Sequence, residues 1–298
     1  MTAVQANDIT LEYEEDGSGE PLLLIMGLGG QLVDWPVGLV GELVERGFRV
    51  IRFDNRDIGL STAFDEVPPP TRGQLARSIT IRRPMPSGYV LSDMAADAVG
   101  LLDALGIDRA HVAGMSMGGM IAQQMAIDHA DRVSSLVSIM STTEHRKVRR
   151  PAPKVARMAL RRQAADEYSI DDAVDFFRAI SGPGFDEAEF RELAERDFER
   201  SFRPDGTARQ LAAIIASGDR TPALQELDVP TLVIHGLVDT LVKPSGGIAT
   251  AEAIPGSRLL MFNDMGHDLP TARHAEIAEA VVRNAERAGA ALGMAVVS

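Results

Sequence analysis

The segment Gly114-Met115-Ser116-Met117-Gly118 places a serine between two glycines in the spacing G-x-S-x-G. A serine hydroxyl is a weak nucleophile unless a sharp turn between a strand and a helix presents it, and flanking glycines leave that turn room against neighbouring backbone. The spacing alone is weak evidence, because it arises by chance in roughly one chain of this length in ten. Its surroundings strengthen it, since Ala110 to Ala113 predicts a strand and Gly119 to Ala126 predicts a helix. The segment therefore predicts a nucleophilic serine and acyl transfer chemistry.

A serine nucleophile needs a general base, and histidine is the side chain best suited to that task near neutral pH. His267 lies in a loop that directly follows the predicted strand Arg258 to Phe262, at the edge of the sheet where α/β active sites form. His235 ends another predicted strand, where a structural role is expected. The other histidines have ordinary explanations in strands, helices or a basic stretch; they are His111, His129, His145 and His274. We therefore predict that His267 is the base.

The third residue of such a site is a carboxylate that orients the histidine ring and stabilises its protonated form. Asp239 fits this role, because it follows the predicted strand Thr231 to His235 after a short turn. Four other carboxylates near these positions are better explained as solvated, turn or cap residues; they are Asp219, Asp228, Asp264 and Asp268. The predicted catalytic residues are thus Ser116, Asp239 and His267, in that order along the chain.

The elements that would position these residues alternate along the chain. Apolar strand patterns at 21–26, 48–53, 133–140, 231–235 and 258–262 are separated by helical patterns at 36–46, 92–105, 245–254 and 271–288. This rhythm is interrupted at 141–224, where charged amphipathic segments such as 171–180 and 187–198 are separated by Gly- and Pro-containing turns. We expect a mostly parallel twisted sheet with helices on both faces, formed by 1–140 and 225–298, with a helical cap at 141–224.

Composition bounds the class of protein. The 298 residues are 45% hydrophobic and 24% charged, which is typical of a globular protein, and they suffice for one large α/β domain. The net charge of −13 opposes nonspecific binding to nucleic acid or anionic membranes, and the absence of cysteine excludes thiolate chemistry. Residues 1–20 lack a signal-peptide pattern and no stretch approaches eighteen apolar residues, so we expect a cytoplasmic protein that does not bind membranes.

Three loops and the order of the catalytic residues resemble the α/β-hydrolase superfamily. Residues 22–30 are similar to its first long strand and oxyanion loop, 54–61 to the loop after the next strand, and 266–270 to its histidine loop. Within the superfamily the chain looks most similar to bacterial carboxylesterases related to aclacinomycin methylesterase. It departs from many members by having Met26-Gly27 in place of His-Gly, and Arg56-Asp57-Ile58-Gly59 in place of Arg-Gly-His-Gly.

The resemblance implies that the backbone amides of Leu28 and Met117 form the oxyanion hole. Methionines are concentrated near the site motifs, and their flexible side chains can adapt to apolar groups of different shape. Met26 and Met265 are our candidates for the substrate pocket, because both lie on the site loops, as does Met117. For Asp54 and Arg56 we expect a salt-bridged role in supporting their loop.

The resulting expectation is hydrolysis of a small-molecule carboxylic ester through an acyl-enzyme, on neutral, apolar substrates of small to medium size. No cofactor and no metal are expected. Hydrolysis of lactones or C–C bonds and cofactor-free perhydrolysis use the same three residues and remain alternatives. A ligand-binding receptor on the same fold is an alternative of another class.

Overall fold

The computed structural model of the chain describes residues 2–81, 87–148, 150–162 and 169–295. In this part of the chain, eight strands form one sheet in the order β1-β2-β4-β3-β5-β6-β7-β8. Strands β3 to β8 pair in parallel, whereas β1 and β2 are antiparallel to their neighbours. The strands are β1 Thr2–Ala6, β2 Ile9–Asp16, β3 Glu20–Ile25, β4 Phe48–Phe53, β5 Ala110–Met115, β6 Val133–Ile139, β7 Thr231–Gly236 and β8 Arg258–Phe262.

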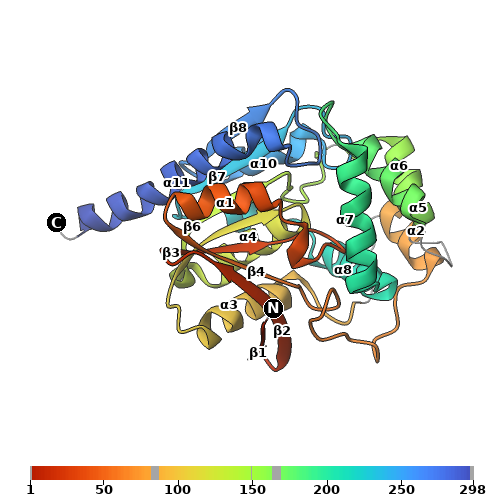
Figure 1. Cartoon of the computed structure of the whole chain (residues 1–298), viewed down its shortest axis with the longest axis horizontal. Helices are drawn as coiled ribbons and strands as arrows, with labels where there is room; N and C mark the ends of the chain where they lie inside the picture. Colours follow the sequence, from red (N-terminus) through yellow and green to blue (C-terminus); the bar gives the residue numbers. More distant parts are fainter. Residues whose placement is uncertain (1, 82–86, 149, 163–168, 296–298) are drawn as a thin grey trace.

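Helices cover both faces of the sheet (Figure 1). Helices α1 and α11 pack together on one face, and α3 and α4 pack together on the other. This arrangement confirms the predicted α/β class. The helices that pack around the sheet are α1 Val37–Glu45, α3 Leu91–Ala104, α4 Met117–Asp128, α9 Thr221–Leu224, α10 Pro244–Ala253 and α11 His274–Ala295. Three short 3-10 helices are η1 Leu32–Asp34, η2 Ala130–Arg132 and η3 Thr271–Arg273.

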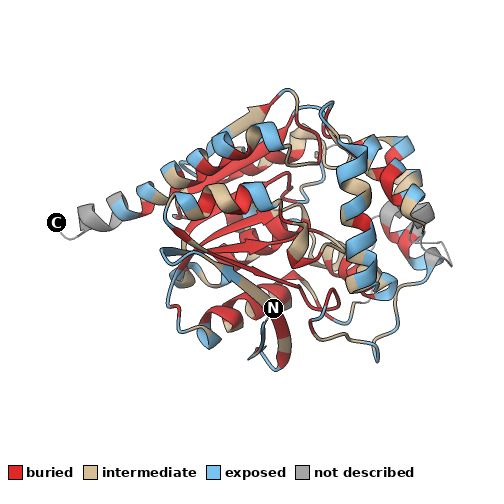
Figure 2. Cartoon of the chain, viewed as in Figure 1, coloured by how far each residue is buried: buried red, intermediate tan, exposed pale blue. Residues whose placement is uncertain are grey.

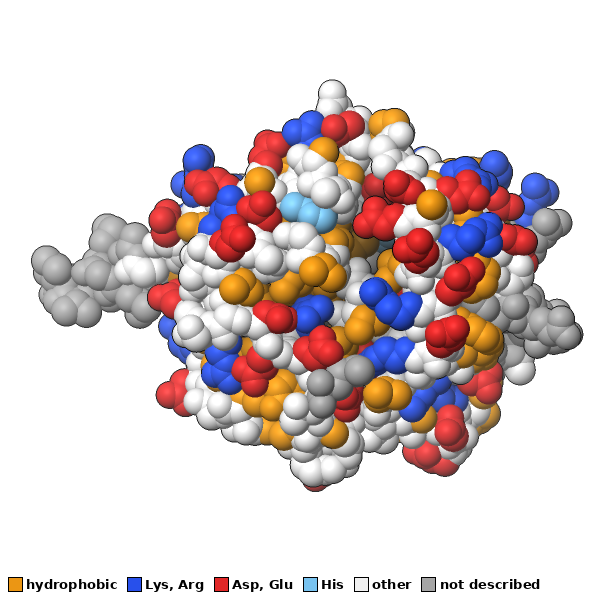
Figure 3. Space-filling view, viewed as in Figure 1, with side chains coloured by type: hydrophobic (Ala, Val, Ile, Leu, Met, Phe, Trp, Pro, Cys, Tyr) orange, Lys and Arg blue, Asp and Glu red, His pale blue; other side chains and the backbone are white. Residues whose placement is uncertain are grey.

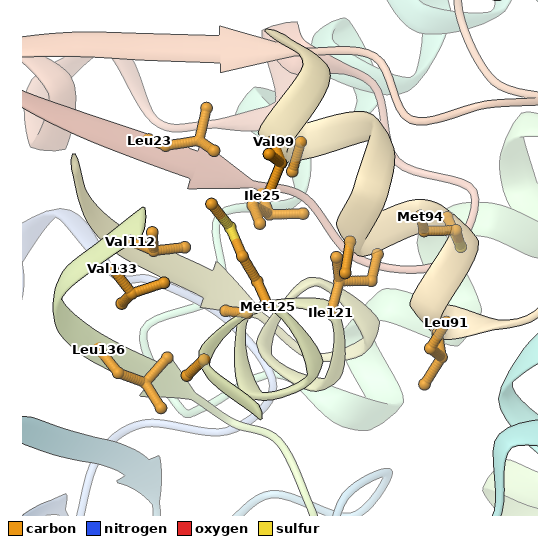
Figure 4. Close-up of a cluster of buried hydrophobic side chains, with 14 of the residues drawn as sticks. Leu23, Ile25, Leu91, Met94, Val99, Val112, Ile121, Met125, Val133 and Leu136 are labelled. Carbon is orange, nitrogen blue, oxygen red and sulfur yellow. The ribbon is translucent and has the colours of Figure 1, made fainter. Parts of the chain in front are cut away.

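The two-residue periodicity of the strands divides the core between these helix pairs. In β3, Leu23 and Ile25 belong to the apolar cluster under α3 and α4, and Leu22 and Leu24 belong to the cluster under α1 and α11. Figure 4 shows the first cluster, in which side chains of the sheet meet those of α3 and α4. Figure 2 shows that the buried residues lie along the central strands and on the sides of the helices that face the sheet. Apolar side chains therefore cover both faces of the sheet, as expected for a parallel sheet with helices on each face.

The N-terminal strands were not predicted from the sequence. Asn7 and Asp8 join β1 to β2 and have φ of 47° and 64°, which makes them the two central residues of a type I′ hairpin turn. Both residue types tolerate positive φ, so this pair between two apolar-polar alternations is the signal that could have revealed the hairpin.

Of the helices between β6 and β7, the first four, here called the cap helices, lie together on the right of Figure 1. They are α5 Pro153–Arg162, α6 Ile170–Ile180, α7 Glu187–Arg200 and α8 Pro204–Ser217. Their starts follow helix capping rules, because Asp186 accepts hydrogen bonds from two amides of the first turn of α7 and Pro204 opens α8. A further helix, α2 (Arg72–Ile81), lies in the long connection after β4, where we had not expected one. Leu75 of α2 packs against Ala212 of α8, which links this connection to the cap helices.

Candidate active site

Ser116 occupies the turn between β5 and α4. Its φ of 56° and ψ of −119° are strained for a residue with a side chain, and such strain costs roughly 1–3 kcal/mol. A Cβ atom at Gly114 would lie 2.0 Å from the Gly118 oxygen, and one at Gly118 would lie 1.9 Å from the Ile25 oxygen. Only glycine fits at either position. The Ser116 amide donates to the Ile139 oxygen over 2.8 Å, which ties the turn to β6.

Asp239 and His267 meet at the carboxyl ends of β7 and β8. Asp239 Oδ2 lies 2.7 Å from His267 Nδ1, while its Oδ1 accepts the amides of Leu241 and Val242 at 2.8 and 2.9 Å. Both side chains are buried, with exposed fractions of 2% for Asp239 and 5% for His267. Because an ionised carboxylate can only accept hydrogen bonds, this contact favours the proton on Nδ1 and leaves Nε2 as a proton acceptor. Ser116 and His267 line the same cavity.

The neighbouring titratable residues have other main partners, although His235 Nε2 also lies 3.6 Å from Asp239 Oδ2. Asp264 pairs with Arg273 at 2.8 Å near the surface, and Asp268 accepts the amides of Gly182 and Gly266. His235 is fully buried, and its Nε2 lies 2.8 Å from the Val242 oxygen. Burial lowers the pKa of His235, so this ring is neutral near pH 7. None of these three residues occupies the place of the Asp239 carboxylate or the His267 ring.

The cavity has a volume of about 2020 Å³ and lies between the core loops and the cap helices. Figure 3 shows the surface hollowed beside α7, with both acidic and basic side chains around the hollow. Leu28 and Met117, whose amides we expect to bind an oxyanion, line the cavity beside Ser116, and Met117 is the first residue of α4. Met26 also lines it.

Met265 is a correction to the prediction. It is fully buried in the apolar cluster under α1 and α11 and is not among the residues that line the cavity. Its carbonyl accepts the Val238 amide, just after β7, over 3.2 Å, and its side chain packs inward although the residue is next to the histidine loop. Met115 and Met120 line the cavity instead, although their positions on a strand and a helix had favoured core packing.

Two acidic residues lie where α7 meets the oxyanion loop. Burial raises the pKa of Asp34 well above its usual range, and its hydrogen bond and charge interaction with Asp197 raise it further. Burial also raises the pKa of Asp197. The same junction contains Gln31, whose Nε2 donates to the Asp197 oxygen over 2.7 Å and to the Ser201 oxygen over 3.1 Å. The end of α7 is therefore bound to the segment that follows the oxyanion loop.

Asp54 and Arg56 are salt-bridged, but with partners that the sequence did not indicate. Arg56 forms two contacts of 2.6 and 2.7 Å with Asp97 of α3, and Asp54 lies 2.8 Å from Arg200 of α7. Asp54 also accepts the Leu32 and Leu60 amides at 2.7 and 2.8 Å. This loop thus connects the oxyanion segment, α3 and the cap helices. Sequence position gave no signal for contacts between such distant elements.

Among the residues that the structure describes, no group of three or more His, Asp or Glu side chains is placed to hold a metal ion. Within the same residues, no helix is both long and apolar enough to cross a membrane.

The family of the chain follows from a family model described as "alpha/beta hydrolase fold", which matches residues 20–270. The chain belongs to the alpha/beta hydrolase family. The resemblance seen in the sequence is thereby confirmed, and the matched residues include the Ser116 turn and the Asp239–His267 pair.

Relatives within the family differ in the activity that their names give. Rhodomycin D methylesterase DauP of Streptomyces sp. (strain C5) is 29% identical, covering 93% of this chain and 95% of its own. A 2-hydroxymuconate semialdehyde hydrolase of Pseudomonas putida is 28% identical, covering 85% and 82%. Among solved structures, an esterase from Thermogutta terrifontis has a TM-score of 0.69 at 25% identity, covering 97% of this chain and 99% of its own. The enol-lactonase from Burkholderia xenovorans LB400 has a TM-score of 0.72 at 24% identity, covering 95% and 99%, and shows the shared fold.

Proposed function

We propose that the chain is a serine hydrolase that cleaves carboxylic esters through an acyl-enzyme. The observation that carries this proposal is the 2.7 Å contact between His267 Nδ1 and Asp239 Oδ2, on a cavity that Ser116 also lines. His267 Nε2 would take the proton of the Ser116 hydroxyl as its oxygen attacks the ester carbonyl. The Leu28 and Met117 amides would stabilise the resulting oxyanion.

The same three residues complete the cycle. Collapse of the tetrahedral intermediate breaks the bond to the alcohol, which leaves with the proton held by His267, and Ser116 keeps the acyl group. A water molecule then gives its proton to His267 and attacks the acyl carbon, which releases the acid and restores the serine. Asp239 would stabilise the protonated ring in both halves. The methylesterase and esterase relatives support this reaction class.

The cavity favours neutral substrates with a large apolar group. Pockets for drug-sized ligands usually measure about 300–1,000 Å³, so a cavity of about 2020 Å³ has room for larger groups than the sequence led us to expect. Aromatic side chains of α6 and α7 line it, and the rings of Phe177 and Phe190 lie 4.3 Å apart. Carboxylate side chains outnumber arginines among the residues that line the cavity, and both this excess and the net charge of −13 disfavour anionic substrates. We propose that the cap helices bind the apolar group while the core loops hold the ester.

A matched ester series tests this assignment. We expect kcat/KM to be highest for neutral esters with bulky apolar groups, when acyl size, branching and charge vary at a fixed leaving group. Phe190→Ala should shift the size preference, and Phe190→Leu should shift it less. A single sharp optimum for an anionic substrate, with neutral esters inert, would contradict the substrate class.

The same screen should include lactones and C–C bond substrates, because relatives with those activities share the fold. Faster turnover of either class than of every ester would replace the ester assignment. Binding without turnover of any substrate would favour a receptor.

A further inference from the structure

The loop that would supply one oxyanion donor is a turn from Gly27 to Gly30. The Gly30 amide donates to the Gly27 oxygen over 3.1 Å, which closes the turn around Leu28 and Gly29. Gly29 has φ of 72°, and Leu28 is not among the described residues with positive φ. A positive φ at the third residue alone is the mark of a type II turn. The central peptide, between Leu28 and Gly29, therefore has the orientation of a type II turn. Glycine at position 29 allows this orientation because it tolerates a positive φ.

A side chain of cap helix α8 contacts this central peptide. Gln210 Oε1 accepts the Gly29 amide over 3.0 Å, and Gln210 Nε2 donates to the Arg56 oxygen over 2.9 Å. The Gln210 side chain is fully buried. The amide thus bridges two core loops, and both of its polar ends are used. Beside it, a Cβ atom at Gly29 would lie 3.0 Å from Thr207 Oγ1, so α8 also fits closely against the turn.

Helix α8 is firmly attached to the core at this place. Arg209 binds Asp57 through Nε at 2.9 Å and Nη2 at 2.7 Å, and the exposed fractions are 4% and 0%. A Cβ atom at Gly206 would lie 2.1 Å from the Asp57 oxygen, so the helix backbone directly contacts the loop. Gln210 is therefore held in place by neighbours on its own helix.

We propose that Gln210 is a positioning residue for the oxyanion hole. Its Oε1 accepts the amide of Gly29, the residue after Leu28 in the closed turn, and its Nε2 ties this contact to the Arg56 loop, so the turn and the Leu28 amide within it are held in place. The Leu28 amide belongs to the preceding peptide, so Gln210 acts on it by fixing the position of the whole turn. The inference rests on the proposed function, because Leu28 serves as a donor only in a reaction that forms an oxyanion. Cap helix α8 is then part of the catalytic framework as well as a wall of the cavity.

The effect should fall on the transition state. Loss of one oxyanion donor typically lowers turnover about 100- to 1,000-fold, and a misplaced donor should cost less than a missing one. Gln210→Met keeps the approximate volume but removes both hydrogen bonds. We expect it to lower kcat about 10- to 100-fold and to change KM by less than about threefold. The affinity for an alkyl boronic acid, whose Ser116 adduct places an oxygen in the hole, should fall by a similar factor.

Gln123→Met is the matched control. Gln123 is also fully buried and uses both ends of its amide, with Nε2 at 3.0 Å from Ser138 Oγ and Oε1 at 3.2 Å from Arg220 Nε. It does not contact the oxyanion loop, so any loss of stability should appear in this variant without a selective loss of boronic acid affinity.

Gln210→Glu provides a second test if Gln210→Met does not fold. A protonated carboxyl can donate to the Arg56 oxygen as the amide does, whereas an ionised one cannot. We expect the ratio of its kcat to that of the wild type, taken at each pH, to rise as the pH falls. Dividing by the wild type removes the effect of proton uptake by His267.

Three results would overturn the inference: a kcat of Gln210→Met within about twofold of wild type, an equal loss in Gln123→Met, or, where only Gln210→Glu folds, a ratio that does not rise. Failure of the proposed function would give a different result, because the wild type itself would then show neither ester turnover nor reaction of Ser116 with the boronic acid.

Discussion

Replacement of Arg209 by methionine should destabilise the protein strongly, because it removes the partner of a buried carboxylate. Asp57 is fully buried and has four contacts: two from Arg209, one from the Tyr89 hydroxyl at 2.7 Å and one from the Phe64 amide at 2.8 Å. Burial acts to raise the pKa of Asp57, but the hydrogen bonds, with that of Arg209 foremost, bring it below its usual value. In Arg209→Met the burial that raises the pKa of Asp57 remains, whereas the Arg209 hydrogen bond, the largest of the interactions that lower it, is lost.

The magnitude follows from the cost of an unpaired buried charge. Removal of one partner of a buried ion pair typically costs about 3–5 kcal/mol, which is a large part of the roughly 5–15 kcal/mol that stabilises a folded domain. Two hydrogen bonds to Asp57 remain, so we expect the lower part of that range. Urea unfolding at pH 7 measures it. Arg178→Met, which removes an exposed ion pair with Glu187, should change the unfolding free energy little.

The stability difference between wild type and Arg209→Met should depend on pH. In the wild type the lowered pKa of Asp57 contributes stability that is present above its unfolded value near 4 and lost as the pH falls. In Arg209→Met the folded pKa of Asp57 should lie above the unfolded value, so the penalty disappears below about pH 4. The stability difference between the two proteins should therefore shrink on acidification. A difference below about 1 kcal/mol at pH 7, or one that does not change with pH, would refute the reasoning.

Three further predictions concern the site and its acidic neighbours. Asp239→Asn should lower kcat by roughly four orders of magnitude, while Asp264→Asn and Asp268→Asn should act far less; steady-state kinetics of the three variants would show the opposite ranking if another carboxylate held the ring. The acylation rate should fall on acidification, since only a neutral His267 ring accepts a proton, and a flat rate from about pH 5 to 8 on a folded enzyme would contradict base catalysis by this residue. Burial raises the pKa of Asp34, so the stability that this group contributes is present below its unfolded pKa near 4 and lost as the pH rises through its higher folded pKa. Asp34→Asn cannot lose stability in this way, so its urea unfolding free energy relative to wild type should increase as the pH rises above about 4. A difference that does not change with pH would contradict this prediction.

Local sequence was sufficient to predict the framework of the site. Ser116, Asp239 and His267 each follow a strand of the parallel sheet, so their placement at the same edge of the sheet follows from strand order and loop length. The glycines around Ser116 are required by backbone contacts within the same turn, which is why the motif is readable without a structure.

Contacts between the cap helices and the core were beyond the reach of local patterns. Gln210 reads as an ordinary polar residue on a helix, and its partner Gly29 lies 181 residues away. The pairing of Arg56 with Asp97 could not be predicted for the same reason, because it depends on how α3 packs against the loop that contains Arg56. Met265 was misassigned because proximity in sequence to the histidine loop does not determine which way a side chain points.

Covalent labelling of Ser116 tests the central claim most directly. A fluorophosphonate probe should add once to the wild-type chain, and peptide mass spectrometry should place the adduct on Ser116. Ser116→Ala should lose both the adduct and ester hydrolysis while it keeps substrate binding. An adduct on another serine such as Ser61, or near wild-type turnover by Ser116→Ala, would contradict the account.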